Sequence, residues 1–243
     1  MKGLLLAALL LSPAAAASAE DLLMGSVVKS DKWKMDRAKD REVFDGNVSF
    51  RNPHYTLKAD HALYAHPART WNVSGSVYTL RLFDDRSQVE VNCDRAIYEE
   101  TQERAFLERG ELPVRMKYTA PDGRALYGTS DRARALNAES RVYFDGNMKL
   151  STEDLDIYSA QGLYDARDAT FLVYGSTPLA VGRREGYDFA VNSDSMKLFR
   201  DSRNVKFYDR VKGWVKDVTA PAPAAAPKKQ KPAKPAKHKH GPL

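Results

Sequence analysis

The sequence predicts an all-β protein made of repeated strand-turn-strand units, and three observations lead to this prediction. Between residues 26 and 211, apolar and polar residues alternate along runs such as VFDGNVSF and TWNVSGSVYTLRL, with little helical periodicity. Turn residues separate these runs, for example Asn52-Pro53 and Pro121-Asp122-Gly123. Similar runs also recur at a spacing of about 32 residues, which is typical of stacked repeats.

The clearest repeat is the tetrapeptide FDGN, which occurs at residues 44–47 and again at residues 144–147. Without a gap, the stretch from Phe44 to Gly75 matches the stretch from Phe144 to Gly175 at nine of 32 positions. Such self-similarity indicates stacked units, none of which buries its apolar face alone. We expect Gly46 and Gly146 to serve the same bend in a strand.

Six units can be followed in order along the chain. The first strand of each unit carries a small residue followed by an acid, or Gln in the fifth unit, at positions Asp31, Asp60, Asp94, Asp131, Gln161 and Asp194. The second strand follows a short turn and contains Val43-Phe44, Trp71 to Val73, Ala105 to Leu107, Val142 to Phe144, Phe171 to Val173 and Val205 to Phe207. Four of these second strands soon reach a glycine, at Gly46, Gly75, Gly146 and Gly175.

The apolar positions of these strands fall on one face, because side chains two residues apart point the same way. An antiparallel sheet folded over on itself would place that face inside. The candidate interior residues are Phe44, Val48, Phe50, Leu57, Trp71, Val73, Val91, Phe144, Met148, Leu150, Ile157, Phe171, Val173, Val205 and Phe207.

Residues 1–19 have the pattern of a signal peptide, with Lys2, an apolar run and the small-residue site Ala17-Ser18-Ala19. We expect cleavage after Ala19 and export of the remainder. The alternative is a retained membrane anchor, although the apolar run is at the lower limit for crossing a bilayer of about 30 Å.

Residues 218–243 form a Lys/Pro/Ala-rich tail with six Lys and no acid, and this composition predicts disorder. The whole chain has a net charge of +6, from 38 basic and 32 acidic residues. Without the tail and Lys2, the net charge is about −1. The body, residues 20–217, is therefore not basic, which argues against a nucleic-acid partner.

Three motifs at the start of the body resemble the OstA-like family of lipopolysaccharide-transport proteins. They are Ser30-Asp31, the strand Phe44-Asp45-Gly46-Asn47-Val48, and Ala59-Asp60, and the likeness extends over residues 27–211. The resemblance implies a β jelly roll folded like a taco, with a hydrophobic groove along its length. It also implies a periplasmic carrier that moves lipopolysaccharide from the inner to the outer membrane as part of a bridge. Its partners would then be proteins of the same fold at the inner-membrane transporter and the outer-membrane translocon.

The candidate interior residues would line this groove and hold the lipid. Such a groove suits acyl chains, because burial of each methylene is worth about 0.8 kcal/mol and requires no polar pocket. The first and last strands, near residues 27–50 and 187–211, would leave open edges. Open edges favour head-to-tail self-association, which does not close on itself and builds filaments.

Two other functions fit parts of the pattern. One is an inner-membrane-anchored component of the same transport pathway with a similar fold, and the other is a structural or adhesive β-repeat protein with a dry core. The mature N-terminus distinguishes the first alternative, and lipid crosslinking distinguishes the second.

Other chemistry is less well supported. The acids of the repeat are too widely spaced for a calcium-binding roll, so we expect them to lie at turns and strand edges and to form hydrogen bonds with the backbone. His54, His61 and His66 are close in sequence but are interpreted as loop histidines rather than a zinc site. Cys93 occupies the small-residue position of its unit and is expected to be buried and unreactive. No catalytic motif is recognisable, and neither a cofactor nor a metal is expected.

Overall fold

The computed structural model describes residues 27–218. The predicted signal peptide at residues 1–19 and nearly all of the predicted tail lie outside this range. The described chain is all-β, as predicted, and contains two short 3₁₀ turns. The elements are β1 (Val27–Lys29), β2 (Lys32–Asp36), β3 (Arg41–Asn52), β4 (Tyr55–Ala65), β5 (Thr70–Leu82), β6 (Gln88–Glu99), η1 (Glu100–Gln102), β7 (Arg104–Glu108), β8 (Val114–Thr119), β9 (Ala125–Ser130), β10 (Arg132–Leu136), η2 (Asn137–Glu139), β11 (Arg141–Ser151), β12 (Leu155–Asp165), β13 (Thr170–Tyr174), β14 (Leu179–Arg184), β15 (Tyr187–Asn192), β16 (Ser195–Phe199), β17 (Val205–Tyr208) and β18 (Lys212–Asp217).

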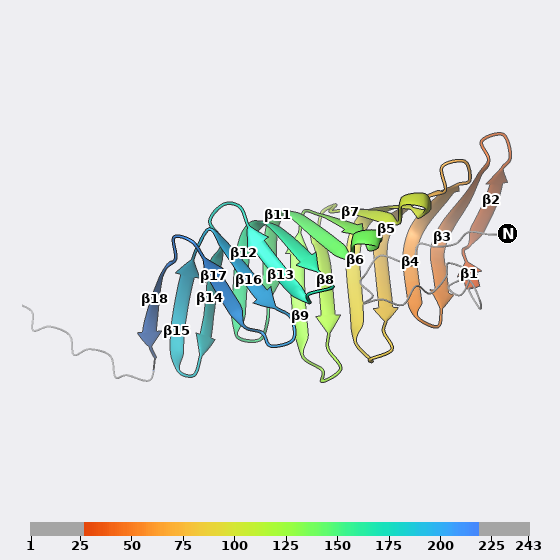
Figure 1. Cartoon of the computed structure of the whole chain (residues 1–243). Helices are drawn as coiled ribbons and strands as arrows, with labels where there is room; N and C mark the ends of the chain where they lie inside the picture. The colour runs from red at the N-terminus through yellow and green to blue at the C-terminus, as the bar shows by residue number, and fades with distance from the viewer. Residues whose placement is uncertain (1–26, 219–243) are drawn as a thin grey trace, which may run out of the picture.

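The strands form one continuous antiparallel sheet that folds over into two walls (Figure 1). Six long strands of 11–13 residues, β3, β4, β5, β6, β11 and β12, run through both walls. Wall A contains one half of each long strand together with β2, β7, β10, β13, β16 and β17. Wall B contains the other halves together with β1, β8, β9, β14, β15 and β18. This arrangement is the folded two-sheet roll that the sequence predicts.

The walls meet along a crease where the long strands bend. At the crease, the pairing register of β3 shifts between Asp45 and Val48, and that of β11 shifts between Asp145 and Met148. Such a bulge adds a residue to one strand and bends it. Gly46 and Gly146 lie at these bends with φ of +74° and +77°, a conformation that glycine adopts without a steric penalty.

The asparagine of the repeated FDGN motif contributes to the bend as well as the glycine. Asn47 and Asn147 follow the glycines with φ of +46° each. The Asn47 side-chain amide donates to Asp31 Oδ2 at 2.8 Å, and the Asn147 amide donates to Asp131 Oδ2 at 2.7 Å. Asp31, between β1 and β2, and Asp131, between β9 and β10, therefore brace the bends of β3 and β11. Their side chains accept from asparagine amides, and that of Asp131 also from Arg109, where the sequence predicts bonds to the backbone.

One member of the acid series is misplaced in the sequence prediction. At the offset of 100 residues, the residue equivalent to Asp60 is Ala160, because Ala160 N donates to Gly175 O in the way that Asp131 N donates to Gly146 O. Gln161 instead directs its amide to Asp145 Oδ1 at 3.4 Å. Matching Gln to Asp by chemical similarity shifted the alignment by one residue, whereas the ungapped repeat places Ala160 there.

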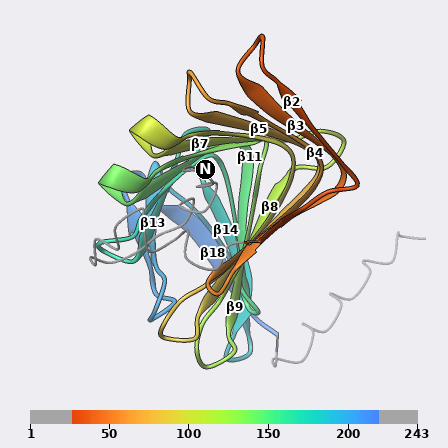
Figure 2. The same cartoon turned by 90° about the vertical axis from the view of Figure 1, so that its right-hand side faces the viewer.

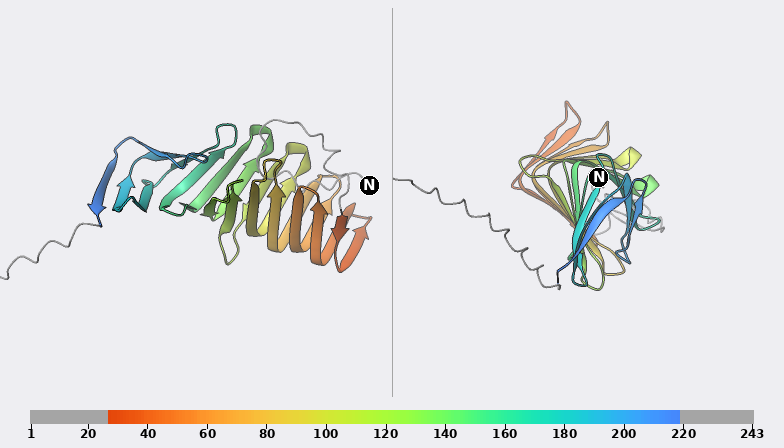
Figure 3. Two further views of the ribbon diagram at one scale, coloured as in Figure 1. Left: turned by 90° about the horizontal axis from the view of Figure 1, so that it is seen from below. Right: turned by 90° about the vertical axis from the view of Figure 1, so that its left-hand side faces the viewer.

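The seam is the side opposite the crease, where the turns of wall A face the turns of wall B. Seen from the N-terminal end, β2 and β3 of wall A are splayed away from wall B (Figure 2). The strands follow one another along the body, so that β1 and β2 lie at one end and β18 lies at the other (Figure 3). Within residues 27–218, we find no helix with the length and hydropathy needed to cross a membrane.

Candidate functional site

The predicted interior residues come together between the two walls. Thirteen of the fifteen belong to one cluster of buried apolar side chains: Phe44, Val48, Phe50, Leu57, Trp71, Val73, Val91, Phe144, Met148, Leu150, Ile157, Phe171 and Val173. The remaining two, Val205 and Phe207, are partly buried and pack against the same cluster at its C-terminal end. Both walls thus present their apolar faces to a single interior.

This interior is filled by its own side chains and is not an open trough along its whole length. In the middle of the body, residues such as Leu150, Ile157 and Val173 are each 1% exposed. Small side chains at Ala62, Ala96, Ala105, Ala133 and Ala135 are buried among them and let the walls approach. The sequence predicts which residues face inward, but it does not reveal how closely the walls pack.

A cluster of three aromatic rings occurs twice in the interior, at an offset of 100 residues, with stacked rings in the first copy and tilted rings in the second. In the first copy, the ring of Trp71 lies 4.6 Å from Tyr64 and 6.0 Å from Phe44, measured between centroids. In the second copy, Phe171 lies 4.4 Å from Tyr164 and 6.4 Å from Phe144. The internal repeat seen in the sequence therefore extends to the packing of the core.

The two copies differ in the charged residue that meets the tyrosine hydroxyl. In the first copy this residue is Glu100, whose side chain is only 3% exposed. Its carboxylate accepts hydrogen bonds from Trp71 Nε1 at 3.1 Å, Tyr64 OH at 3.2 Å and Arg69 Nε at 3.2 Å. Burial and the neighbouring Glu100 carboxylate raise the pKa of Tyr64 to about 12. This acid is fully engaged in the structure of wall A.

In the second copy the equivalent residue is Arg200, at the turn between β16 and β17. Its Nη1 donates to Tyr164 OH at 2.9 Å, and its Nε donates to Asp201 Oδ1 at 2.8 Å. The guanidinium also lies over the ring of Tyr118, which belongs to β8 in wall B, at 5.0 Å from its centroid. Phe171 has no N–H group to offer, so the polar network of the first copy is not repeated, and the charged residue reaches across the seam.

The same turn makes two further contacts across the seam. Arg203 Nη1 donates to Ala125 O at 2.9 Å, and Arg124 Nη2 donates to Asp201 O at 3.4 Å. These contacts join wall A to the turn between β8 and β9 in wall B. Together with the stacking of Arg200 on Tyr118, they hold the seam closed in the C-terminal half of the body.

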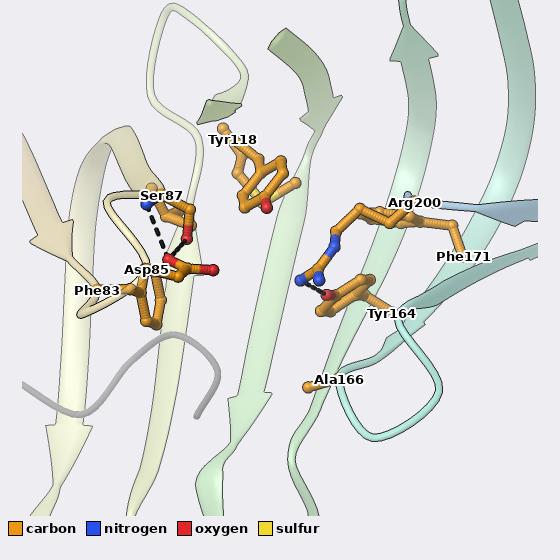
Figure 4. A pocket seen from close by; sticks show the side chains of 10 residues that line it. Phe83, Asp85, Ser87, Tyr118, Tyr164, Ala166, Phe171 and Arg200 are labelled. Carbon is orange, nitrogen blue, oxygen red and sulfur yellow. Dashed lines mark hydrogen bonds between the residues drawn. The ribbon is translucent and has the colours of Figure 1, made fainter. Parts of the chain in front are cut away.

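A cavity of about 80 Å³ lies beneath Arg200 at the seam. Figure 4 shows Asp85 and Ser87 on one side of it and Arg200 with Tyr164 on the other. The remaining lining residues are apolar or aromatic: Phe83, Val89, Met116, Tyr118, Ala166 and Phe171. Five of the lining residues, Val89, Met116, Tyr118, Tyr164 and Phe171, also belong to the buried core cluster, so the cavity borders the apolar interior directly.

Both ends of the body expose apolar side chains that face the interior. At the N-terminal end, Trp33 pairs with Phe44 and therefore shares its inward face, yet it is 62% exposed. At the C-terminal end, Val215 pairs with Phe189 and is 67% exposed. The apolar face thus continues to the edge strands at both ends, where no further strand of the described chain covers it.

The other residues considered in the sequence do not converge on a site. His54 and His66 lie in turns as predicted, whereas His61 lies in β4 and not in a loop. His61 meets Asp45, and His66 Nε2 meets Glu42 Oε1 at 3.1 Å. Within residues 27–218, no group of three or more His, Cys, Asp or Glu side chains is placed to hold a metal ion. Cys93 is buried, as predicted, and burial raises the pKa of its thiol to about 12.

Sequence reasoning missed Glu100, Arg200 and Asp85. A signal for two of them was present, because the 100-residue offset that relates Tyr64 to Tyr164 also relates Glu100 to Arg200. The charges are opposite, so a search for similarity passes over the pair. Nothing in the sequence indicates that Asp85 lies opposite Arg200, because this depends on how the walls close.

Comparison with known proteins gives only distant structural neighbours and no relative by sequence. No family model matches the chain, and no curated protein matches its sequence. Among solved structures, it is similar to LptH from Pseudomonas aeruginosa, described as the LptA-homologous periplasmic component of the lipopolysaccharide transport device. The identity is 14%, the match covers 62% of this chain and 82% of that one, and the TM-score is 0.28.

Proposed function

We propose that this protein is a periplasmic carrier that binds lipopolysaccharide, or a related glycolipid, by its acyl chains between the two walls. It would pass the lipid from the inner toward the outer membrane as part of a bridge. It would act as a binding protein and not as an enzyme. The OstA-like motifs of the sequence and the geometry of the interior both support this proposal.

The observation that carries the proposal is the continuous apolar face shared by both walls. It extends from Trp33 at one end to Val215 at the other, and both residues face inward while remaining exposed. An ordinary sandwich core would be covered at its ends, since exposed apolar surface is unfavourable. A path for acyl chains has to continue to both ends so that the lipid can move on.

Acyl chains can replace the contacts that the walls now make with each other. Burying about twelve methylenes is worth roughly 10 kcal/mol, which can offset the separation of part of the interior. The crease offers a natural hinge, since its bulges bend the long strands at Gly46 and Gly146. The lipid would then select a more open arrangement of the walls from those the protein samples.

The edge strands suit a bridge made of several copies or of partners with the same fold. At the N-terminal end, β1 and β2 are the outermost strands of walls B and A. At the C-terminal end, β18 and β17 occupy the same positions. Pairing of these edges would continue both walls and the apolar face from one protomer to the next, toward a transporter on one side and a translocon on the other.

A pair of variants on one strand tests lipid binding without disturbing the fully buried core. Phe207 faces the interior because it pairs with the buried Met196, whereas its neighbour Tyr208 points to the opposite face. We expect Phe207→Glu to weaken the binding of labelled lipopolysaccharide at least tenfold, because the charge would meet acyl chains, and Tyr208→Glu to bind as the unchanged protein does. Equal binding by all three proteins would contradict the proposal.

Because the interior is filled by its own side chains, a protein with a dry core is the second candidate function. A structural or adhesive β-repeat protein would have the same buried residues and would bind no lipid at all.

The other alternative from the sequence, an inner-membrane-anchored relative of similar fold, differs in the segment before Glu20. Sequencing the mature protein tests it, because a chain that begins at Glu20 has lost the anchor.

A further inference from the structure

We propose that the seam cavity beneath Arg200 binds the polar headgroup of the lipid, with a phosphate at Arg200 and a hydroxyl or amino group at Asp85. This inference rests on the proposed function and adds to it a defined polar site. The site would fix where along the body the headgroup sits while the acyl chains occupy the interior. The site consists of the Arg200 cation, the Asp85 carboxylate on the opposite side of the cavity, and the aromatic side chains that line the cavity.

Arg200 is suited to hold a phosphate at the entrance to an apolar space. Its side chain is 25% exposed, so it is largely withdrawn from water but still reachable. Two of its nitrogens, Nε and Nη1, are held by Asp201 and Tyr164, and its Cζ lies 5.0 Å from the centroid of the Tyr118 ring, so three contacts position the guanidinium. Arginine remains charged and offers several N–H groups, which makes it the preferred side chain for phosphate.

Asp85 supplies the second half of the site. Its Oδ1 accepts hydrogen bonds from Ser87 N at 2.8 Å and from Ser87 Oγ at 2.6 Å. The Ser87 hydroxyl and backbone N–H hold the pKa of Asp85 below its usual value, so the carboxylate is ionised at neutral pH. The Ser87 bonds occupy one oxygen and position the group as an acceptor for a hydroxyl or ammonium donor. A phosphate alone would be repelled by Asp85, which is why the fitting headgroup carries both features.

The cavity connects the polar groups to the apolar interior. Its volume of about 80 Å³ is several times the roughly 10–15 Å³ that admits a single water molecule. Phe83, Tyr118 and Phe171 line it beside Arg200 and Asp85, and Tyr118 and Phe171 belong to the core cluster. An amphiphile with its headgroup between Arg200 and Asp85 would therefore direct its chain between the walls.

The first copy of the repeat shows that a charged residue at this position does not have to face a cavity. Glu100, the equivalent of Arg200, is enclosed by Trp71, Tyr64 and Arg69 and serves the packing of wall A. Arg200 has two polar contacts, with Tyr164 and Asp201, and lies over the ring of Tyr118, but it also lines the seam cavity, which Glu100 does not. A purely structural role for Arg200 would consist of its contacts with Tyr118, Tyr164 and Asp201, and the experiment separates this role from binding.

The test uses three dodecyl phosphodiesters, which have one alkyl chain and no glycerol backbone, each below its critical micelle concentration. Dodecylphosphoglycerol carries hydroxyl donors, dodecylphosphoethanolamine carries an ammonium donor, and dodecylphosphocholine has a quaternary ammonium group and no N–H or O–H donor. Binding to the full chain is measured by isothermal titration calorimetry. We expect the two donor-bearing lipids to bind several-fold more tightly than the choline lipid, because only they can donate to Asp85.

The variants Arg200→Gln and Asp85→Asn should act differently. Arg200→Gln should weaken all three lipids about tenfold, since all carry the phosphate. Asp85→Asn should remove the preference for the donor-bearing headgroups, so that the ratio of affinities falls to about one. The exposed Arg184 provides a matched control, because Arg184→Gln removes the same charge far from the cavity and should leave all affinities unchanged.

Loss of a structural contact would weaken all three lipids in both variants and would not alter the ratio between headgroups. An unchanged ratio in Asp85→Asn, or affinities within twofold of the original in Arg200→Gln, would overturn the headgroup site. If the lipids bind and Phe207→Glu weakens them while Arg200→Gln does not, the headgroup site fails and the carrier function stands. If no lipid binds to the unchanged protein, the carrier function itself fails.

Discussion

Gly146 and Gly123 share a positive φ, but their surroundings differ, and this difference separates two contributions to stability. A Cβ at Gly146 would lie 2.5 Å from Asp131 Oδ2, whereas a Cβ at Gly123 would meet nothing within 4 Å. We expect Gly123→Ala to lower the free energy of unfolding by about 1 kcal/mol, the conformational penalty alone. Gly146→Ala should lower it by at least about 2 kcal/mol, because the clash is added. Urea denaturation followed by circular dichroism measures both.

The double variant Asp131→Ala/Gly146→Ala identifies the source of the larger loss. Removing the carboxylate removes the closest contact and leaves only that with the Cβ of residue 131 at 2.9 Å, so the two substitutions together should cost less than the sum of the single effects. Strict additivity would mean that the bend at Gly146 does not depend on the contact with Asp131. The same relation should hold at Gly46 and Asp31, where a Cβ would lie equally close to the carboxylate.

Cys93 should be unreactive in the folded protein and should make stability depend on alkaline pH. Its pKa of about 12, against about 8.5 in an unfolded chain, lowers the thiolate fraction at pH 8 by a factor on the order of 10³. Iodoacetamide should therefore label it rapidly only when urea is present. Because the folded pKa is raised, the stabilisation is fully present below the unfolded pKa and is lost as the pH rises through the folded pKa.

The denaturant midpoint should therefore fall between pH 8 and pH 11, and Cys93→Ser should reduce this fall without abolishing it. The remainder comes from tyrosines such as Tyr64, whose pKa is also raised by burial. Rapid labelling of the native thiol at pH 8 would show that the interior around Cys93 is accessible to water.

Individual residues of the interior could be predicted because their alternation is visible in the sequence. All fifteen predicted positions are buried or partly buried against the core. Their role toward a lipid stays a proposal. The polar residues of the seam could not be predicted in the same way, because Arg200 and Asp85 lie on different walls and meet only through the closure of the fold.

At the scale of the element, the 3₁₀ turn η1 is held to wall A by the side chain of its first residue. The Glu100 carboxylate receives three hydrogen bonds, from Trp71, Tyr64 and Arg69. We expect Glu100→Ala to lower the free energy of unfolding by about 2–4 kcal/mol, because buried donors on Trp71 and Tyr64 lose their acceptor.

Gln102 lies in the same turn but is exposed, so Gln102→Ala provides the control and should change stability by less than about 0.5 kcal/mol. Thermal unfolding monitored by tryptophan fluorescence measures both variants, because Trp71 is buried whereas Trp33 and Trp214 are already exposed, so the change in emission should come mainly from Trp71. Similar losses for both variants would mean that the turn contributes through its backbone and not through the carboxylate.

The strand pairs of wall A follow the six units of the sequence, from β2 and β3 to β16 and β17. The hairpins β8–β9 and β14–β15, which complete wall B, do not belong to those units. They could not be assigned because their sequences lack the repeated acid and glycine. They occupy the places in wall B where the series of long strands is interrupted. Only the pairing of the strands in the folded protein shows this.

At the scale of the whole molecule, the exposed ends of the apolar face should drive association between copies. Trp33 faces inward at the N-terminal edge and is 62% exposed. In a head-to-tail filament, it would be covered by β17 of the next copy. We expect Trp33→Asp to raise the dissociation constant at least tenfold, since a buried tryptophan commonly dominates such an interface.

Lys34 lies on the opposite face of the same strand, so Lys34→Asp should associate nearly as the unchanged protein does. Sedimentation velocity over a range of concentrations distinguishes the two variants. If the unchanged protein is monomeric at every concentration, the proposed self-association is wrong, although a bridge of different proteins with this fold would still be possible.

The overall roll could be predicted from the alternation, the repeat and the family resemblance together. The closeness of the two walls could not be predicted, since it depends on many small side chains packing across the interior. The remaining question for the whole molecule is whether acyl chains enter this space.

Photo-crosslinking from neighbouring positions on β11 answers this question most directly. Phe144 faces the interior and Tyr143 faces outward on the same strand, so p-benzoylphenylalanine at each position samples opposite sides of wall A. With lipopolysaccharide present, we expect Phe144 to give a protein–lipid adduct and Tyr143 to give little or none. Adducts at Tyr143 alone, or none at either position while the lipid is bound, would contradict binding between the walls.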